Sequence, residues 1–238
     1  TRLVGSEMCI RDRIIAKKRG VYMEPYIILD GVSKSFRSVE VLKPLSIEFE
    51  EGLIHGIVGR NGSGKTVMMK LILGFLKPTQ GTVTVGKKRV GKDVDFPQDV
   101  GAIIENVDFI PYLNAYDNLY NLAAIRHRIT KEDVKQVLET VGLGDTGRKK
   151  VAKFSLGMRQ RLAIAQAIME KPKLIILDEP MNGLDKRGVE EMRQIFLNLK
   201  AEGTTILLAS HNMEDIRCLC DKVYEMDDGV LTPIDGVS

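Results

Sequence analysis

The sequence LIHGIVGRNGSGKT, residues 53–66, carries the strongest structural signal in the chain. Residues 53–58 form a mostly apolar run, which predicts a strand buried inside a covered sheet. A glycine-rich loop follows, and residues 67–76 then place apolar side chains at helical spacing until Pro78 ends the pattern. A strand, a glycine-rich loop and a helix in this order predict the start of a parallel α/β unit.

The loop at residues 59–66 matches the pattern G-x-x-x-x-G-K-T, in which consecutive backbone N–H groups surround a phosphate group. The helix that begins near Lys65 adds the positive end of its dipole. Lys65 can reach the β- and γ-phosphates, and Thr66 can offer its hydroxyl to Mg²⁺. The loop therefore predicts a site for a nucleoside triphosphate with Mg²⁺, and by itself it fits a kinase, a GTPase or a motor. The residues that we expect to contact the nucleotide are Gly59, Arg60, Asn61, Gly62, Ser63, Gly64, Lys65 and Thr66.

A second motif, LIILDE at residues 174–179, narrows the chemistry. Four apolar residues predict a buried strand, and two carboxylates follow at its carboxyl end, where α/β sheets bind ligands. Asp178 suits contact with Mg²⁺, and Glu179 is the candidate to orient or deprotonate an attacking water molecule. The alternative is that the two acids cap the next helix. The phosphate loop elsewhere in the chain favours the catalytic interpretation.

A third motif, FSLGMRQR at residues 154–161, is by itself typical of an amphipathic helix with Ser155 as N-cap. It resembles the L-S-G-G-Q signature of ATP-binding cassette (ABC) proteins, from which it differs at three of five positions while keeping Ser155 and Gly157. A hydroxyl and a backbone N–H at a helix N-terminus would form a second anion site. The resemblance implies that the signature of one subunit closes on ATP held by the phosphate loop of another.

Further residues take their expected roles from the same resemblance. Asp185, in the run NGLD, matches the D-loop aspartate that helps to fit the two subunits together. His211 matches the switch histidine, which contacts the γ-phosphate and the attacking water molecule. Phe36 stands where the family places an aromatic residue that stacks on adenine, and Val41 is expected to line the same pocket.

One residue departs from the family pattern. Glu105 stands where the family has the Q-loop glutamine, which contacts Mg²⁺ and the membrane partner. A carboxylate is a charged oxygen ligand, so we expect Glu105 to join Thr66 and Asp178 as a metal contact, whereas the coupling to subunit closure could be altered. Together with residues 155–160, Glu105 resembles the bacitracin-resistance and lantibiotic-immunity branch of ABC exporters.

The rest of the chain predicts how these motifs are arranged. Strand patterns occur at residues 26–29 and 45–49, with Asp30 and Gly31 as a turn signal. Residues from about 106 to 160 read as a helical insertion, in which Thr130 is a candidate N-cap. Strands and helices then alternate, which favours a mostly parallel sheet. The resemblance implies an α/β fold of the P-loop NTPase class and ABC type, with an N-terminal antiparallel β subdomain and an inserted helical subdomain.

The composition separates the first residues from the rest of the 238-residue chain. Hydrophobic residues make up 44% and charged residues 28%, which is typical of a globular protein with a core. Residues 1–22 hold six Lys and Arg against two acidic residues, which leaves the remainder with 29 basic and 30 acidic groups. This near-neutral remainder argues against nucleic acid as the main partner. We expect residues 1–22 to be a non-native leader and residues 23–238 to form one ABC ATP-binding domain; the alternative for the leader is a basic amphipathic membrane anchor.

These observations and the resemblance lead to one functional hypothesis. The chain is expected to be the ATP-binding and ATP-hydrolysing subunit of an ABC transporter, acting as a dimer, most simply a homodimer, with ATP and Mg²⁺ as cofactors. It is expected to drive export of an antimicrobial peptide or another amphipathic drug through a separate integral membrane permease, from the cytoplasmic face of the membrane. The alternatives that stay open are a soluble ABC ATPase not coupled to transport, a different cargo such as a lipid or an ion, and import in place of export.

Overall fold

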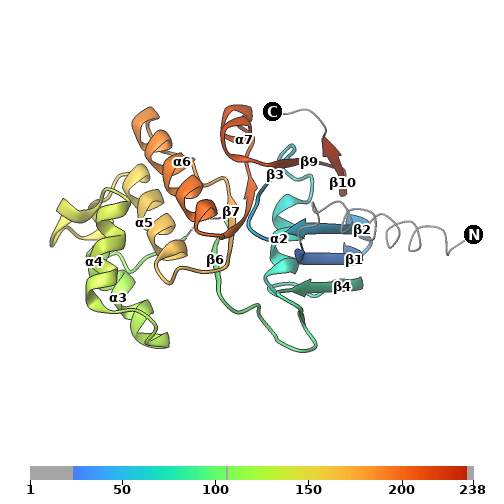
Figure 1. The fold of residues 1–238 in the computed structure, drawn as a ribbon, viewed down its shortest axis with the longest axis horizontal. Coiled ribbons are helices and arrows are strands. Elements are labelled where there is room, and N and C mark those ends of the chain that lie inside the picture. The colour runs from blue at the N-terminus through green and yellow to red at the C-terminus, as the bar shows by residue number, and fades with distance from the viewer. Residues whose placement is uncertain (1–23, 106, 235–238) are drawn as a thin grey trace, which may run out of the picture.

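The computed structural model describes residues 24–105 and 107–234, which form two β-sheets and a set of helices (Figure 1). The predicted leader, residues 1–22, lies outside the described residues. The strands are β1 (Pro25–Phe36), β2 (Val39–Glu50), β3 (Ile54–Val58), β4 (Gln80–Val85), β5 (Lys88–Arg89), β6 (Val100–Ile103), β7 (Leu174–Asp178), β8 (Thr205–Ala209), β9 (Lys222–Asp227) and β10 (Val230–Ile234). The helices are α2 (Lys65–Ile72), α3 (Ala115–Arg126), α4 (Lys131–Thr140), α5 (Leu156–Ile168), α6 (Lys186–Ala201) and α7 (Met213–Leu219), with short 3₁₀ turns η1 (Gly144–Thr146) and η2 (Val151–Lys153).

The larger sheet has six strands in the order β10-β9-β3-β8-β7-β6. Strand β10 pairs antiparallel with β9, and the other neighbouring strands run parallel. All residues of β3 and β8 are buried, as are the four apolar residues of β7. These strands show continuous apolar runs because both faces of the sheet are covered. The mostly parallel core predicted from the sequence is confirmed.

The smaller sheet has four strands in the order β2-β1-β4-β5, all antiparallel, which confirms the predicted N-terminal β subdomain. Helix α2 lies between the two sheets (Figure 1). Its Met68, Met69 and Ile72 side chains are fully buried in a core shared with Phe49 of β2 and Ile57 of β3. Burial of this helix fixes the loop that precedes it at the carboxyl end of β3.

The first hairpin differs from the prediction. We expected Asp30 and Gly31 to form a turn, whereas Gly31 lies within β1 at a φ of 59°. The pairing register with β2 shifts between Leu29 and Val32, which marks a β-bulge. A single residue with left-handed backbone lets the strand bend and continue, so β1 runs on to Phe36. The predicted turn was therefore wrong.

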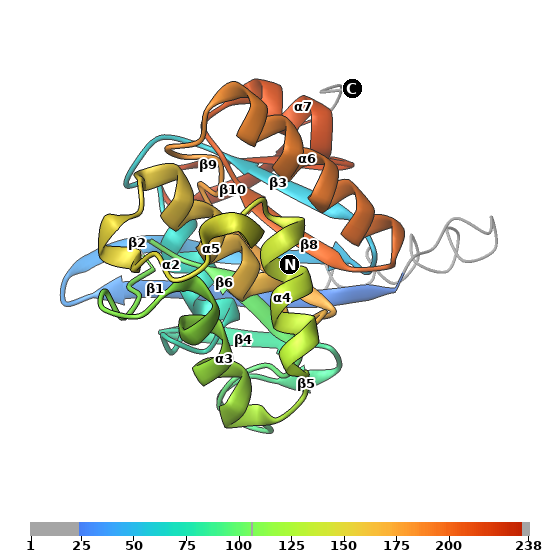
Figure 2. The same ribbon diagram turned by 90° about the vertical axis from the view of Figure 1, so that its left-hand side faces the viewer.

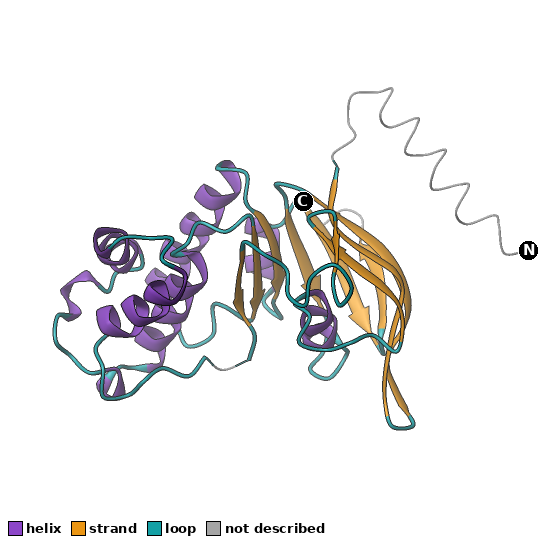
Figure 3. Ribbon diagram, turned by 90° about the horizontal axis from the view of Figure 1, so that it is seen from below, coloured by secondary structure: helices purple, strands orange, loops and turns teal. Residues whose placement is uncertain are grey.

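Helices α5 and α6 pack on the side of the large sheet that faces the viewer in Figure 2, and α4 packs on α5 with α3 beside it. Figure 3 shows these helices at the opposite end of the molecule from the small sheet. Helices α3 and α4 fall within the predicted helical segment, whereas α5 continues to Ile168 and packs on β6. The contact is close, because a Cβ at Gly101 would lie 1.8 Å from the Ala167 carbonyl oxygen. Among the described helices, none combines the length and the apolar character needed to cross a bilayer.

The predicted start of α4 provides a test of local sequence signals. The Thr130 hydroxyl accepts a hydrogen bond from the Asp133 backbone N–H, and the Asp133 carboxylate accepts one from the Thr130 N–H, which forms a complete capping box. We expect Thr130→Ala to lower the free energy of unfolding by about 1 kcal/mol in urea denaturation, because the Asp133 backbone N–H at the start of the helix loses its acceptor. Thr140→Ala at the other end of the same helix is the matched control and should leave stability nearly unchanged. Equal effects of the two substitutions would contradict the capping role.

Candidate functional site

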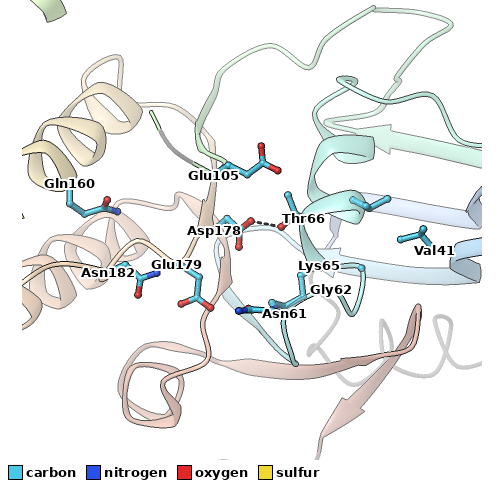
Figure 4. Close-up of a pocket in the computed structure, with 12 residues that line it drawn as sticks. Val41, Asn61, Gly62, Lys65, Thr66, Glu105, Gln160, Asp178, Glu179 and Asn182 are labelled. Carbon is cyan, nitrogen blue, oxygen red and sulfur yellow. Dashed lines mark hydrogen bonds between the residues drawn. The ribbon is translucent and has the colours of Figure 1, made fainter. Parts of the chain in front are cut away.

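A pocket of about 450 Å³ opens where the carboxyl ends of β3 and β7 meet the start of α2 (Figure 4). The loops that follow parallel strands lie at the same edge of a sheet, so motifs far apart in the sequence converge there. Most of its lining residues come from the segments singled out in the sequence. The lining consists of Val41, Asn61, Gly62, Gly64, Lys65, Thr66, Val67, Glu105, Gln160, Asp178, Glu179 and Asn182.

The phosphate loop is held against β9. A Cβ at Gly59 would lie 2.2 Å from the Met226 carbonyl oxygen, and the φ of 153° at Gly59 favours glycine. Gly59 is therefore required by close backbone contact as well as by conformation. The Ser63 hydroxyl beside it is buried and finds no hydrogen-bond partner among the described residues. A buried hydroxyl without a partner is costly, so this loop suits a ligand that supplies an acceptor.

Lys65 lies inside this loop. Its Nζ donates to the carbonyl oxygens of Gly59, at 2.6 Å, and Arg60, at 3.0 Å, and the residue is only 6% exposed. Both acceptors are neutral, so they hold the ammonium in place without cancelling its charge. Lys65 lines the pocket and presents a fixed positive charge there, as its predicted contact with a phosphate group requires.

Thr66 and Asp178 meet directly. The Thr66 hydroxyl donates a 2.6 Å hydrogen bond to the Asp178 carboxylate, so the first residues of α2 touch the end of β7 (Figure 4). A hydroxyl and a carboxylate are oxygen ligands of the kind that Mg²⁺ prefers, and Mg²⁺ usually completes its shell with water and phosphate oxygens. No group of three or more His, Cys, Asp and Glu side chains in the described chain could hold a metal by itself. The donor set thus fits a metal that binds together with a phosphate ligand.

Glu179 and His211 are also brought together. His211 Nδ1 lies 2.8 Å from Glu179 Oε2, although the two residues are 32 positions apart. They meet because β7 and β8 are neighbours, with Asp178 paired to Ala209. The other carboxylate oxygen of Glu179 is buried and has no hydrogen-bond partner in the described part of the chain. The pocket therefore contains an oriented carboxylate with one oxygen free to accept a proton or a hydrogen bond.

A buried ion pair anchors the helix that follows His211. Arg193 of α6 donates to the Asp215 carboxylate from Nε, at 2.9 Å, and Nη2, at 2.6 Å, and Asp215 is 1% exposed. Burial opposes the charge on Arg193, but its hydrogen bonds to Asp215 and Glu214 outweigh burial and raise the pKa of the guanidinium. The pair stays ionised and connects α6 to α7, which fixes the position of the segment carrying His211.

Ser155, Gly157 and Asp185 are not among the residues that line this pocket. The Ser155 hydroxyl caps α5 by accepting from the Met158 N–H at 3.2 Å, and Asp185 caps α6 by accepting from the Gly188 N–H at 2.8 Å. The two helix ends adjoin, because a Cβ at Gly157 would lie 2.9 Å from the Gly183 carbonyl oxygen. Ser155 is exposed, so the structure groups Ser155, Gly157 and Asp185 on a surface of their own.

The two predicted adenine contacts are placed differently. Val41 lines the pocket, whereas Phe36 does not, and Phe36 is 42% exposed. The Lys34 ammonium lies 5.0 Å from the centre of the Phe36 ring and donates to the Lys77 carbonyl. Stacking of adenine on Phe36 stays a prediction.

Three lining residues were not predicted, of which Val67 directly follows the phosphate loop and the other two lie far from it in the sequence. Gln160 of α5 lines the pocket while its amide donates to the Pro180 carbonyl at 2.8 Å, and Asn182 follows in the same loop. Both lie inside motifs quoted above, at residues 154–161 and 182–185. Their distance in sequence from the phosphate loop gave no sign that they reach the same pocket.

Comparison with known proteins decides the family. The protein family described as ABC transporter matches residues 42–182, a segment that includes both the phosphate loop and the LIILDE motif. The chain belongs to this family.

Curated relatives agree with this assignment. The chain is 43% identical to the uncharacterized ABC transporter ATP-binding protein YybJ of Bacillus subtilis (strain 168), over 84% of this chain and 92% of the relative. It is 40% identical to the bacitracin transport ATP-binding protein BcrA of Enterococcus faecalis, over 88% of this chain and 68% of BcrA. It is 34% identical to the lantibiotic transport ATP-binding protein SrtF of Streptococcus pyogenes, over 81% of this chain and 83% of SrtF. The predicted resemblance to this branch of the ABC family is confirmed.

Solved structures show the same fold. The dimeric structure of the ATP-binding cassette MJ0796 in a post-hydrolysis state with ADP and Pi matches with a TM-score of 0.78 at 24% identity, over 88% of this chain and 99% of that chain. The structure of an ATP-binding subunit of an ABC transporter matches with the same TM-score and identity, over 90% of its length. The cassette fold expected from the sequence is confirmed.

Proposed function

We propose that this chain is the ATP-hydrolysing subunit of an ABC exporter and works as a dimer on a separate membrane permease. One observation carries the proposal. Lys65, the Thr66–Asp178 pair and the Glu179–His211 pair surround one pocket, whereas Ser155 lies at an exposed helix end outside it. The pocket thus has the groups for hydrolysis but lacks the signature residues, which a second copy would supply.

The side chains suggest a division of work during hydrolysis. Lys65 and the N–H groups of residues 59–66 would bind the phosphates, and Glu179 would accept a proton from the attacking water molecule through its unpartnered oxygen. His211, 2.8 Å from the other oxygen, would orient Glu179 and reach toward the γ-phosphate. Thr66 and Asp178, with Glu105 nearby, would hold Mg²⁺, which supplies charge stabilisation to the phosphates when bound.

The exposed signature surface suggests how two copies would meet. Ser155 and Gly157 begin α5, and the end of a helix that starts at an exposed serine can bind an anion. Placed against the pocket of a second copy, this end would contact the γ-phosphate that Lys65 holds. Asp185, at the neighbouring helix end, would then lie near the contact between the copies. ATP would act as the bridge between the two subunits.

The names of the relatives suggest the cargo. BcrA is a bacitracin transport protein and SrtF a lantibiotic transport protein, and both are 34% or more identical to this chain. We infer that the cargo is an antimicrobial peptide or a similar amphipathic compound, exported by a permease that this subunit contacts from the cytoplasmic side. The segment from Glu105 through α3 would pass the motion to the permease.

Glu179 provides a direct test of hydrolysis. We expect Glu179→Gln to keep ATP binding but to lower the turnover rate about 10²- to 10⁴-fold, because the amide cannot accept the proton of the attacking water molecule. Steady-state phosphate release and ATP-binding calorimetry measure the two quantities. Glu202→Gln, at an exposed position after α6, is the control and should keep normal turnover. Undiminished turnover in the Glu179 variant would remove this residue from the catalytic role.

Coupling to transport needs a separate test. We expect the chain to co-purify with a multi-helix membrane protein encoded in the neighbouring reading frame, and ATP hydrolysis by the complex to rise severalfold with bacitracin or a lantibiotic. Vesicles reconstituted with the complex should move the stimulating peptide only when ATP is present. ATP hydrolysis with no membrane partner and no response to peptides would favour a soluble ABC ATPase in place of an exporter.

A further inference from the structure

The pocket is lined by three carboxylates and one lysine, Lys65, although the proposed ligand is a polyanion. All three carboxylates, Asp178, Glu179 and Glu105, are expected there from the sequence, and Glu105 stands where the family has an uncharged glutamine. Each carboxylate that faces the pocket repels a triphosphate before a metal ion is present. The chain therefore needs to offset the charge of Glu105.

Lys70 provides this offset in the structure. Its Nζ lies 2.7 Å from Glu105 Oε1, and Lys70 follows Thr66 by one helical turn on α2. Figure 4 shows the Glu105 side chain extending toward this helix rather than toward Gln160. The pair thus fastens the loop that follows β6 to the same helix face that carries a predicted metal contact.

The geometry of Glu105 indicates that this contact has a purpose other than fold stability. Glu105 has a φ of 58°, in the left-handed region that side chains other than glycine adopt at a cost. The Lys70 and Glu105 side chains are 27% and 62% exposed, and an ion pair with this much solvent contact adds little to folding free energy. What the pair does change is the position and the effective charge of a carboxylate at the pocket wall.

We propose that Lys70 is a positioning residue for the nucleotide site: by pairing with Glu105 it holds this carboxylate at the wall and offsets its charge, so that ATP can enter before the metal ion does. A glutamine at position 105 would carry no charge and would not need this lysine. Lys65 cannot substitute for it, because the carbonyl oxygens of Gly59 and Arg60 fix its ammonium inside the phosphate loop. The inference rests on the proposed ATP site and adds that metal-free ATP binding there requires Lys70 to offset the charge of Glu105.

A double-mutant cycle tests this coupling. Calorimetry measures the binding of ATP in EDTA to the wild-type chain, Lys70→Met, Glu105→Gln and the double variant. We expect Lys70→Met to weaken metal-free ATP binding about three- to tenfold, because it leaves the Glu105 charge unopposed. The double variant should bind within about twofold of Glu105→Gln alone, and Lys70→Arg should bind like the wild-type chain.

Controls separate this role from general effects of charge or folding. Lys135→Met removes an exposed lysine that pairs with Glu132 on α4 and does not line the pocket, and it should leave ATP affinity unchanged. The loss of ATP affinity in Lys70→Met should also become smaller when the salt concentration rises from about 0.05 to about 0.5 M, because salt screens interactions between partly exposed charges. Thermal melts of each variant would check that it folds.

Two results would overturn the inference. If Lys70→Met weakens ATP binding by the same factor in the wild-type chain and in the Glu105→Gln variant, Lys70 acts independently of the carboxylate. If it has no effect on metal-free binding, the charge of Glu105 needs no offset. In both cases the wild-type chain still binds ATP and the proposed function stands, whereas a wild-type chain that binds no ATP removes the proposed function itself.

Discussion

The close contact between the phosphate loop and strand β9 underlies the rest of the site. Gly59 passes so near the Met226 carbonyl oxygen that no side chain fits, and the Lys65 ammonium binds the loop from inside through two carbonyl oxygens. The N–H groups of the loop point toward one site and repel one another, and these contacts oppose that repulsion. These contacts order the loop in the absence of a ligand, which lowers the binding energy that ordering it would cost.

Neighbouring parallel strands determine which functional side chains lie next to the loop. Strand β7 delivers Asp178 and Glu179 at its carboxyl end, and β8, paired to it, delivers His211 just beyond Ala209. The start of helix α2 places Thr66 beside Asp178, so side chains from distant parts of the sequence lie within hydrogen-bond distance. The signature on α5 lies outside this arrangement, on the exposed end of a different helix. One chain thus presents two separate surfaces, the pocket and the exposed start of α5, which the proposed dimer would bring together.

The sequence predicted the site motifs better than their surroundings, for physical reasons. Continuous apolar runs and capping residues act locally, so the strand at residues 53–58 and the capping box at Thr130 were found. Strands β6, β9 and β10 were not predicted, because β6 is only four residues long and the pairing of β9 and β10 is a tertiary property. Likewise, no local pattern shows that Glu105 pairs with Lys70, or that Phe36 stays outside the pocket lining.

The central claim is that two copies close face to face over ATP, and disulfide trapping tests it most directly. Asn61 of the phosphate loop and Leu156 of the signature are both exposed and would meet only between copies. Equal amounts of Asn61→Cys and Leu156→Cys chains, each also carrying Glu179→Gln and serine in place of the native cysteines, are oxidised with ATP, with ADP or without nucleotide. The account predicts a covalent mixed dimer with ATP and almost none under the other two conditions. Absence of this dimer at saturating ATP, with the permease present, would contradict the account.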